Sequence, residues 1–576
     1  MPAPIDTRSR AATLAAVALV VVAVLRVATT YPVFNQAYDE PAHIACGMEW
    51  LDKGTFGMEP QHPPLPRVMA ALGPYLAGLR LPEVKFADGK STNGYDFYTT
   101  GNQILYARGQ YQLNLTLARL GTLPFLVIGC CVVFVWARSL GGDGLGLLAV
   151  FLFTTLPIVL GYCTLAYVDP ALMAMFPAAL LALVRWLDAP DWGRSVIWRS
   201  LILGAAVAGA ALANAPWMVF LPPCFLGILV CRRWAVRVDD QAGFTTSLRF
   251  CWRPLLLALA AFCFVLWGGY RFSVQRLDHV FDHPVQSAER IPSPARALAL
   301  KVVALNPPLP APEFFKGVAN SVGENGKLYP AYLFGKVRRG GWWYFYFFML
   351  IFKTPPTLLL LAAVGVGSGL MRLWNNRDWQ TAAPAVSVIL ILLVSMTIKV
   401  NIGMRTILFL YPLLAVAAAL GCREIWRLRS RWPQAVPALL IALLAGLAID
   451  GAWIHPNYLT YTSTLAGADP SRSLVLDADF DAGQNVSRLA RQLAEHHVDH
   501  LKLRIYTSAD LAQMGLPPFE ILAPYERATG WIAVSVHNLR TGEGPWYPEK
   551  IDGYAWLNAY QPVFSVDQTI RVYYVQ

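Results

Sequence analysis

A series of eleven apolar segments constrains the fold of this chain more than any other feature. A helix needs about 20 predominantly apolar residues to cross the hydrocarbon core of a bilayer, and these segments approach that length. The sequence is 56% hydrophobic and only 14% charged, whereas an average soluble domain is roughly a quarter charged. We therefore predict an all-α polytopic membrane protein. Its expected spans are residues 11–28, 114–136, 144–162, 170–187, 200–214, 216–231, 254–270, 355–371, 381–398, 406–421 and 436–454.

Two of these boundaries depend on proline. Residues 200–231 are too long for one untilted span, so we expect two helices that separate at Asn214–Pro216. The apolar stretch 342–371 is also too long, and Pro355 interrupts it. This break leaves Trp342–Phe352 as an aromatic anchor in the membrane interface.

The basic residues between the spans give the chain a direction. They gather in alternate loops, which is the asymmetry expected of the cytoplasmic side. We therefore place the N-terminus in the cytoplasm and the C-terminus outside. The net charge of +11 then reflects topology and does not indicate a nucleic-acid partner. Lys399 and Arg405 are exceptions in a short outer loop. The predicted inner loops hold Arg138, Arg194, Arg199, Arg232, Arg233, Arg237, Arg249, Arg253, Arg372, Arg377, Arg423, Arg427, Arg429 and Arg431.

The chain divides into a transmembrane domain, residues 1–454, and a C-terminal part, residues 455–576. The first has two large polar outer loops, 31–112 and 271–341, and the apolar but short stretch 65–79 is expected to lie in the interface. The second alternates strand and helix patterns, which predicts a small extracytoplasmic α/β domain. Its expected strands are Ser473–Leu476, Leu501–Tyr506, Trp531–His537 and Thr569–Val575, and Val486, Leu489, Ala490, Leu493 and Ala494 share one helical face.

The acidic pair Asp39-Glu40 follows the first span directly. A carboxylate at this place, facing a protein-lined cavity, can act as a general base on a hydroxyl or an amine. The same residues also suit the start of a helix over 40–51, because aspartate is a favoured N-cap and Pro41 fits the first turn. The two roles are compatible, and the local pattern does not separate them.

Two further polar residues fall on the same predicted side. His62 precedes Pro63 and Pro64, which fix its direction and make it a candidate ligand of a metal or phosphate, although a lone loop histidine is commonly an ordinary surface residue. Asp169 stands at the outer end of a span, where it either shares an acidic cavity with Asp39 or caps the next helix.

Arg405 lies on the side where the charge rule predicts few cations. Its planar guanidinium suits a phosphate group, and the alternative is a side chain that extends along the interface toward water. The sequence has no Walker loop, no strand–GxGxxG–helix unit and no HExxH motif, so we expect no nucleotide cofactor and a lipid-linked donor for any sugar transfer. The nine cysteines are scattered in apolar segments and indicate neither disulfides nor a metal site.

Several of these pieces, taken in order, resemble the GT-C membrane glycosyltransferases. The closest branch is the bacterial phospholipid-carrier-dependent enzymes related to protein O-mannosyltransferases and aminoarabinose transferases. The resemblance covers nearly the whole chain. It rests on Asp39-Glu40, His62-Pro63-Pro64-Leu65, Asp169, Gly341-Trp342-Trp343-Tyr344, Lys353-Thr354-Pro355, Asn401 to Arg405 with Tyr411-Pro412, His455 to Leu459, Asp481 to Gln484, and Tyr554 to Leu557.

The resemblance implies a polyprenyl-phosphate sugar donor and transfer outside the membrane, usually with inversion. It casts Asp39 as the base, with Glu40 beside it. The implied donor-phosphate residues are Arg405, His62, Asp169 and Lys353, and a divalent metal would make His62 or Asp169 its ligands. Two positions differ from the family pattern: Asn214 stands where many relatives carry a lysine, and Lys336 where a glutamate is common.

The sequence therefore gives the hypothesis of a glycosyltransferase in the bacterial inner membrane. It would move a sugar from a polyprenyl-phosphate carrier to a glycan, lipid or protein acceptor on the extracytoplasmic face, with Asp39 as general base. Membrane lipids are its other expected partners. The alternatives are a transporter or flippase, and a catalytically inactive scaffold of the same fold in envelope assembly.

Overall fold

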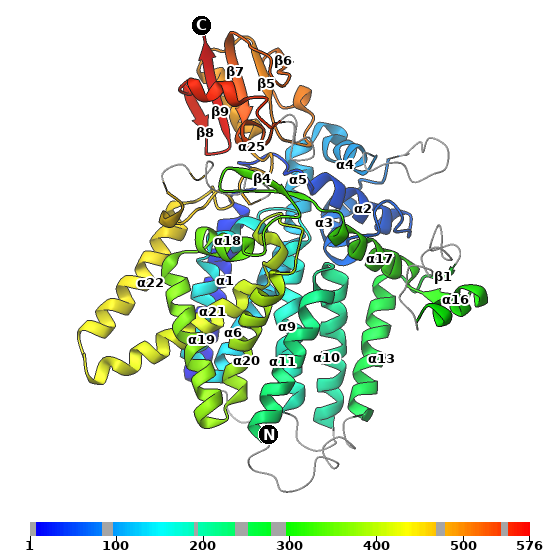
Figure 1. Cartoon of the computed structure of the whole chain (residues 1–576), viewed down its shortest axis with the longest axis vertical. Coiled ribbons are helices and arrows are strands. Elements are labelled where there is room, and N and C mark those ends of the chain that lie inside the picture. Colours follow the sequence, from blue (N-terminus) through cyan, green and yellow to red (C-terminus); the bar gives the residue numbers. More distant parts are fainter. Residues whose placement is uncertain are drawn as a thin grey trace.

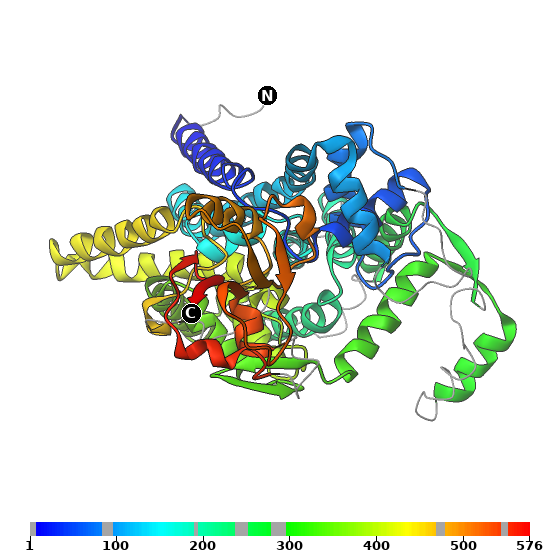
Figure 2. The ribbon, with the colours of Figure 1, turned by 90° about the horizontal axis from the view of Figure 1, so that it is seen from above.

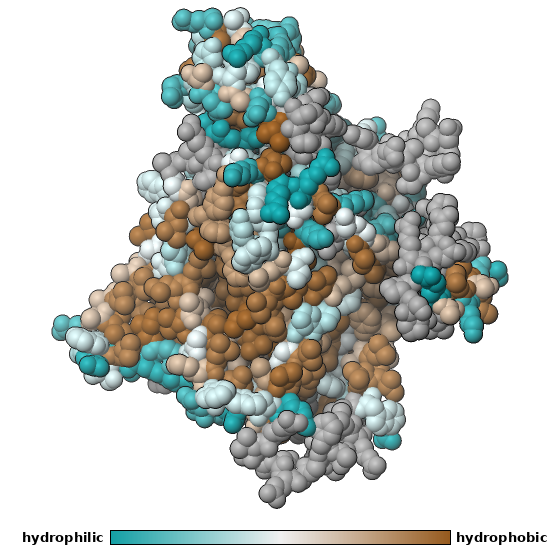
Figure 3. Space-filling view, viewed as in Figure 1, coloured by the Kyte–Doolittle hydropathy of each residue, from teal (hydrophilic) through white to brown (hydrophobic). Residues whose placement is uncertain are grey.

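A bundle of long helices, topped at one end by a small β-sheet, makes up the protein (Figure 1). The computed structural model describes residues 7–82, 96–188, 194–236, 252–277, 295–467, 470, 479–542 and 551–576. On the face shown in Figure 3, hydrophobic residues form a broad belt around the middle, and both ends are hydrophilic. This is the surface expected of a chain embedded in a bilayer.

The bundle consists of the helices that the apolar segments predict. A described helix lies at each predicted span. The helices are α1 (Thr7–Ala28), α6 (Leu123–Gly141), α7 (Asp143–Thr154), α8 (Pro157–Cys163), α9 (Asp169–Leu187), α10 (Arg194–Ala213), α11 (Trp217–Val236), α13 (Trp252–Gly269), α19 (Pro356–Asn376), α20 (Trp379–Ser395), α21 (Leu410–Arg427) and α22 (Ala435–Trp453).

The length and composition of the described helices support fewer spans than the eleven predicted. Eight of the described helices are long and apolar enough to cross a membrane, or nine if the bent pair α7 and α8 forms one span. Helix α20 has only 17 residues. Helix α21 has 18 residues, but Arg423, Glu424 and Arg427 make its last turns charged. The protein is a multi-pass helical membrane protein, and the count of eleven remains a prediction.

Proline explains where the bundle departs from straight helices. Helix α10 ends at Ala213 and α11 begins at Trp217, which confirms the predicted break at Asn214–Pro216. The span expected over 144–162 is a bent pair of helices, because α7 and α8 meet at an angle of 67°. Leu156, just before Pro157, has an extended backbone, since a residue that precedes proline disfavours the helical region.

A layer of short elements covers the end of the helical bundle nearest the sheet, and part of it extends to one side of the bundle (Figure 1). Helix α2 is its most buried helix, with ten of its 13 residues buried, and α3 packs against α2 and α5. The layer contains α2 (Glu40–Asp52), α3 (Pro64–Leu76), α4 (Asp96–Tyr106), α5 (Tyr111–Leu120), β1 (Val274–Arg276), α16 (Ala295–Leu305), β2 (Pro308–Pro310), α17 (Pro312–Gly326), β3 (Pro330–Leu333), β4 (Lys336–Arg339) and α18 (Phe345–Lys353).

The C-terminal part forms a mixed five-stranded sheet in the order β6-β5-β7-β9-β8. Strand β5 is parallel to β6 and β7, and β9 is antiparallel to β7 and β8. The predicted strand Ser473–Leu476 lies outside the described residues. Figure 2 looks down onto this sheet, which covers only part of the bundle. The elements are α24 (Val486–Glu495), β5 (Leu501–Arg504), β6 (Phe519–Ile521), β7 (Gly530–Ser535), α25 (Val536–Thr541), β8 (Phe564–Val566) and β9 (Ile570–Val575).

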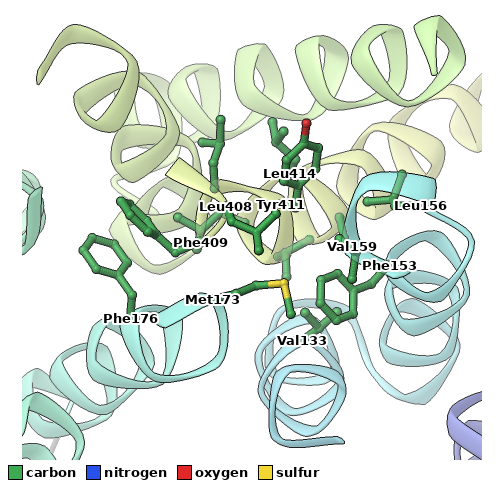
Figure 4. Close-up of a cluster of buried hydrophobic side chains, with 14 of the residues drawn as sticks. Val133, Phe153, Leu156, Val159, Met173, Phe176, Leu408, Phe409, Tyr411 and Leu414 are labelled. Atoms are coloured by element: carbon green, nitrogen blue, oxygen red, sulfur yellow. The ribbon is translucent and has the colours of Figure 1, made fainter. Parts of the chain in front are cut away.

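The core beneath the sheet gathers around α21. Figure 4 shows Phe176 of α9 beside Phe409, and Met173 between helices; the centroids of the two phenyl rings are 4.2 Å apart. Helices α19 and α21 cross so closely that a Cβ on Gly365 would strike the carbonyl of Ala417. Small residues permit this approach in membrane helices, and the crossing fixes the start of α21 near the polar layer.

Candidate active site

Three segments that are far apart in the sequence meet at Arg405. Asp39 immediately precedes α2, Asp169 is the first residue of α9, and Arg405 lies in a short 3₁₀ turn, η3 (Met404–Ile407), before α21. Nη1 of Arg405 lies 2.8 Å from Oδ2 of Asp39, and its Nε lies 3.2 Å from Oδ2 of Asp169. One guanidinium therefore joins the two carboxylates that the sequence placed on one face.

The geometry separates the readings that the sequence left open. The Asp39 carboxylate does not cap α2, nor is Asp169 a capping residue of α9, whose N-cap is Val168. Arg405 does not extend into solvent, since its side chain is only 10% exposed. All three side chains are directed to one another instead.

Asp39 is the most accessible member of this cluster. Its side chain is 27% exposed, against 3% for Asp169. The Tyr98 hydroxyl of α4 donates to Oδ1 of Asp39 over 3.1 Å, and the Asp39 amide donates to the Tyr167 hydroxyl over 3.3 Å. The Arg405 guanidinium lies over the Tyr167 ring, 4.7 Å from its centroid. Tyrosines thus fix Asp39 and Arg405 while one side of Asp39 stays open.

The Arg405 charge governs the protonation of Asp39. Burial raises the pKa of Asp39, but the attraction of the Arg405 guanidinium outweighs it and holds the pKa below its ordinary value. The same carboxylate acts in the opposite sense on its hydrogen-bond donor, because burial and the Asp39 charge both raise the pKa of Tyr98. Asp39 is therefore ionised and Tyr98 neutral near pH 7.

Asn214 completes the cluster from the end of α10. Its Nδ2 donates to Oδ1 of Asp169 over 3.2 Å, so each Asp169 oxygen has a partner. The position where the family pattern has a lysine thus lies in the site, but it carries no charge. Lys336 lies in β4 with an exposed side chain.

Glu40 points to different partners from those of its neighbour Asp39. Arg119 of α5 donates to both carboxylate oxygens over 2.8 Å, and the amides of Ala37 and Ala166 donate over 2.6 and 2.8 Å. Glu40 is fully buried. Through these contacts Glu40 holds the loop before α2 onto α5 and the segment before α9, and the catalytic role expected of it stays a prediction.

His62 and His43 form a second polar group beside Asp39. Nδ1 of His62 lies 2.9 Å from Oε2 of Glu59, which also binds Arg67. The His43 and His62 rings meet edge to face with centroids 5.7 Å apart. Nε of Arg67 donates to Nδ1 of His43 over 3.3 Å. Burial and the Arg67 charge lower the pKa of His43 well below its ordinary value, so this imidazole is neutral and carries its proton on Nε2.

The residues expected as metal ligands do not suit a divalent cation. Among the described residues, no three His, Cys, Asp or Glu side chains gather as a metal site. Both oxygens of Asp169 are engaged by Arg405 and Asn214, and a guanidinium at 3.2 Å repels a cation. His62 is bound to Glu59. The structure therefore places neither candidate in a ligand arrangement.

Lys353 differs from the phosphate-binding role that the resemblance implies. Its side chain is buried, and Nζ donates to the carbonyls of Leu459 over 2.9 Å and Asp479 over 2.6 Å. Burial lowers the pKa of Lys353 to about 8. Both contacts tie α18 to the start of the C-terminal part, because a buried ammonium needs acceptors and these carbonyls provide them.

Asp479 is a residue that the sequence reasoning missed as part of the site. Its Oδ2 accepts the amide of Met404 and its Oδ1 accepts the Tyr162 hydroxyl. It is fully buried against Gly403. Asp479 thus anchors the turn that carries Arg405. Its one sequence signal is that it lies just before the Asp481 to Gln484 stretch, on which the family resemblance partly rests.

No protein-family model matches the sequence, and no curated protein is similar to it in sequence. Among solved structures, it is similar to ArnT from Cupriavidus metallidurans bound to undecaprenyl phosphate, with 12% identity over 96% of this chain and 97% of that one and a TM-score of 0.47. Archaeal oligosaccharyltransferase AglB from Archaeoglobus fulgidus, in complex with an inhibitory peptide and a dolichol-phosphate, is 12% identical over 97% of this chain and 74% of that one, with a TM-score of 0.44. At these values the function has to be argued from the residues of this chain.

Proposed function

We propose that this protein is an integral-membrane glycosyltransferase that moves a sugar from a polyprenyl-phosphate carrier to an acceptor, with Asp39 as general base. The observation that carries the proposal is the Asp39–Arg405–Asp169 cluster, in which a partly open carboxylate and a buried guanidinium lie 2.8 Å apart. Transfer from a lipid phosphate needs both groups: a base for the acceptor and a cation for the departing phosphate.

Arg405 retains donors for a phosphate in this arrangement. A guanidinium has five N–H groups in a planar fork, and Asp39 and Asp169 use Nη1 and Nε. Nη2 makes no hydrogen bond to a described residue. A phosphate that binds there would compete with Asp39 for the positive charge of Arg405. The guanidinium would then stabilise the ionised form of Asp39 less. The pKa of Asp39 would then rise toward its ordinary value, so that donor binding makes the base stronger.

The reaction follows in one step. The acceptor hydroxyl or amine attacks the anomeric carbon and passes its proton to Asp39, while the bond from that carbon to the phosphate oxygen breaks. The electron pair of this bond leaves with the polyprenyl phosphate, whose charge Arg405 stabilises. Attack from the face opposite the leaving group inverts the configuration of the sugar. No step uses a metal or a nucleotide.

His43 offers a further contact for the substrate. Its Nε2 is buried and has no hydrogen-bond partner in the described part of the chain. A buried donor without a partner costs about 1–3 kcal/mol, so such groups in a native structure call for an explanation. The His43 ring touches Tyr167, which contacts both Asp39 and Arg405. We assign this N–H to a phosphate or sugar oxygen of the donor.

The topology predicted from the sequence supports a reaction outside the cytoplasm. The basic loops of the sequence put the cytoplasm at the end of the bundle away from the Asp39 cluster. Transfer would therefore occur on the extracytoplasmic face of a bacterial inner membrane, where a lipid-linked donor is available and nucleotide sugars are not. The prenyl chain would lie against the apolar belt, and the acceptor would be a glycan, a lipid or a protein.

One observation favours a second candidate, an inactive scaffold of the same fold. Asn214 supplies no positive charge beside Asp169, so Arg405 must balance two carboxylates as well as the incoming phosphate. Such a protein would bind a polyprenyl-phosphate sugar and release it unchanged. A transport function gains no comparable support from the cluster.

The test is Asp39→Asn in the full-length protein, reconstituted in lipid with labelled polyprenyl-phosphate hexoses and pentoses and a membrane extract as acceptor source. Loss of a general base should lower transfer by about 10²–10⁴-fold. The matched control is Asp52→Asn at the other end of α2, whose carboxylate faces Lys53 and Arg80. Transfer by Asp39→Asn within about tenfold of wild type would remove Asp39 as the base. Donor binding by the wild type without any transfer would favour the scaffold.

A further inference from the structure

A charged cavity lies at the opposite end of the bundle from Asp39. It has a volume of about 350 Å³ and opens between the last turns of α19 and α21. The two helices touch at Gly365 and Gly421, and beyond this crossing they leave room between them. One face of α19 and two residues of α21 line the cavity: Val364, Gly367, Ser368, Met371, Arg372, Asn375 and Asn376, with Glu424 and Arg427.

Three arginines gather around a single carboxylate in this region. Glu424 lies 3.0 Å from Arg372, 2.6 Å from Arg427 and 3.5 Å from Arg423. Asp378, at 3.9 Å from Arg372, is the second acidic group in contact with these arginines. The cluster therefore keeps an excess of positive charge. Like charges held this close repel one another, and an anion between them relieves that repulsion.

The hydrogen-bond donors of the cluster are incompletely used. Nη2 of Arg423, next to the lining residue Glu424, is buried and has no hydrogen-bond partner among the described residues. Asn375, Asn376 and Ser368 add neutral donors to the cavity wall. Arginine and amide donors around one pocket match the oxygens of a phosphate group, which accept several hydrogen bonds at once.

Exposed apolar side chains lie on α19 and α21 at this end of the bundle. Met371 and Trp374 of α19 are 62% and 74% exposed, and Trp426 of α21 is 40% exposed. Tryptophan is enriched where a membrane protein meets the headgroups. On the face in Figure 3, hydrophilic residues follow the lower edge of the apolar belt, at the end away from the C-terminal sheet. The charged cavity therefore lies at headgroup depth and adjoins surface that acyl chains cover.

We propose that this cavity binds the phosphate headgroup of an anionic phospholipid, with the acyl chains along the exposed apolar face of α19. Basic pockets between transmembrane helices on the cytoplasmic side are a recurrent form of lipid recognition, and the predicted topology puts this end in the cytoplasm. The site is independent of the glycosyltransferase proposal, because it lies at the other end of α21 from Arg405. A bound lipid would join the ends of α19 and α21.

Direct binding tests the proposal. The purified full-length protein in a nonionic detergent is titrated with short-chain phosphatidylglycerol, with phosphatidylcholine of the same chain length, and with glycerol 1-phosphate. Phosphatidylglycerol should bind at least tenfold more tightly than either of the others. Each of Arg372→Gln and Arg427→Gln should weaken it about fivefold, since one basic residue near a lipid surface contributes roughly that factor.

A second variant blocks the cavity without changing its charge. A Cβ on Gly367 would meet nothing within 4 Å, so Gly367→Leu fills open space, and leucine is also a better helix former than glycine. It should abolish the preference for phosphatidylglycerol over phosphatidylcholine. Arg431→Gln is the control, because Arg431 is an exposed arginine near the same membrane boundary that does not line the cavity.

The outcomes are distinct. Equal binding of phosphatidylglycerol by wild type, Gly367→Leu and Arg372→Gln would overturn the site. Glycerol 1-phosphate that binds as tightly as phosphatidylglycerol would show a pocket for soluble phosphates and overturn the lipid assignment. A loss in Arg431→Gln as large as that in Arg372→Gln would reduce the effect to general surface charge and also overturn it.

Discussion

Nη1 of Arg405 lies 2.8 Å from Oδ2 of Asp39, although the two residues are 366 positions apart. The contact joins the loop after the first helix to the turn before α21. It also brings together an outer aspartate and the outer arginine that the sequence marked as candidates for chemistry. The role of each group in the reaction can be measured separately with single variants.

Arg405→Lys tests whether the planar guanidinium is needed, because lysine keeps the positive charge. An ammonium is a point charge and cannot hold Asp39 and Asp169 in the plane that the guanidinium spans. We expect KM for the polyprenyl-phosphate sugar to rise about tenfold to a hundredfold, which corresponds to the loss of one charge-assisted hydrogen bond. Arg405→Gln, which also removes the charge, should raise KM for the donor further. Steady-state kinetics against donor concentration measures both, and a lysine variant with wild-type KM would contradict a phosphate site that depends on the guanidinium plane.

Glu40→Gln separates a structural carboxylate from a catalytic one. Breaking a buried ion pair costs about 3–5 kcal/mol because it leaves the partner uncompensated, and Arg119 is as buried as Glu40. We therefore expect a clearly lower unfolding temperature in detergent, whereas Asp39→Asn should change it little, since Asp39 is partly exposed. Transfer per folded molecule should stay within about tenfold of wild type. A Glu40→Gln protein that is fully stable but inactive would restore the catalytic role.

The pH profile follows from the depressed pKa of Asp39. A carboxylate with a lowered pKa stays ionised, and keeps its pairing with Arg405, until the pH falls through that lowered value. The acid limb of kcat/KM should therefore lie below the ordinary aspartate pKa of about 3.9. Tyr98→Phe removes a hydrogen bond to the charged form and should move this limb to higher pH.

The control for that shift is Tyr106→Phe on the same helix, α4, whose hydroxyl does not contact Asp39. It should leave the acid limb in place. An acid limb near pH 6–7 in the wild type would point to a histidine instead of Asp39.

The sequence predicts elements well where their signal is local. Apolar runs locate the helices, and Pro216 marks the break between α10 and α11, because both signals lie within one turn of the boundary they set. The bend at Pro157 is not predicted, because residues 144–162 form one apolar run of ordinary length. In the structure α7 and α8 differ in direction by 67°.

Contacts between distant segments lie beyond such patterns. Arg119 falls inside a predicted span, and nothing near it shows that its partner Glu40 is 79 residues away. Asp479 is 317 positions from Tyr162. The family resemblance implies that Lys353 binds the phosphate, whereas its ammonium group donates hydrogen bonds to two carbonyls of the C-terminal part. A charged residue can be found from sequence, but the partner that its charge meets depends on the folded chain.

Asp479→Asn tests whether the C-terminal part positions Arg405. The asparagine keeps the size of Asp479, but its amide replaces one of the two oxygens that accept the Met404 amide and the Tyr162 hydroxyl. One donor is then left facing another, so the turn Gly403–Ile407 should shift. We expect a KM for the donor raised about tenfold or more with a smaller change in kcat, because Arg405 is displaced while Asp39 is not.

The matched control is Asp510→Asn, an aspartate of the same C-terminal part whose carboxylate accepts hydrogen bonds from the nearby Ala512 and Gln513. It should have wild-type kinetics. Global destabilisation by Asp479→Asn would lower the unfolding temperature and kcat together, whereas a positioning role raises KM at an unchanged unfolding temperature. Equal KM values in both variants would leave Arg405 to be held by Asp39 and Asp169 alone, since these are the other groups that bind its guanidinium.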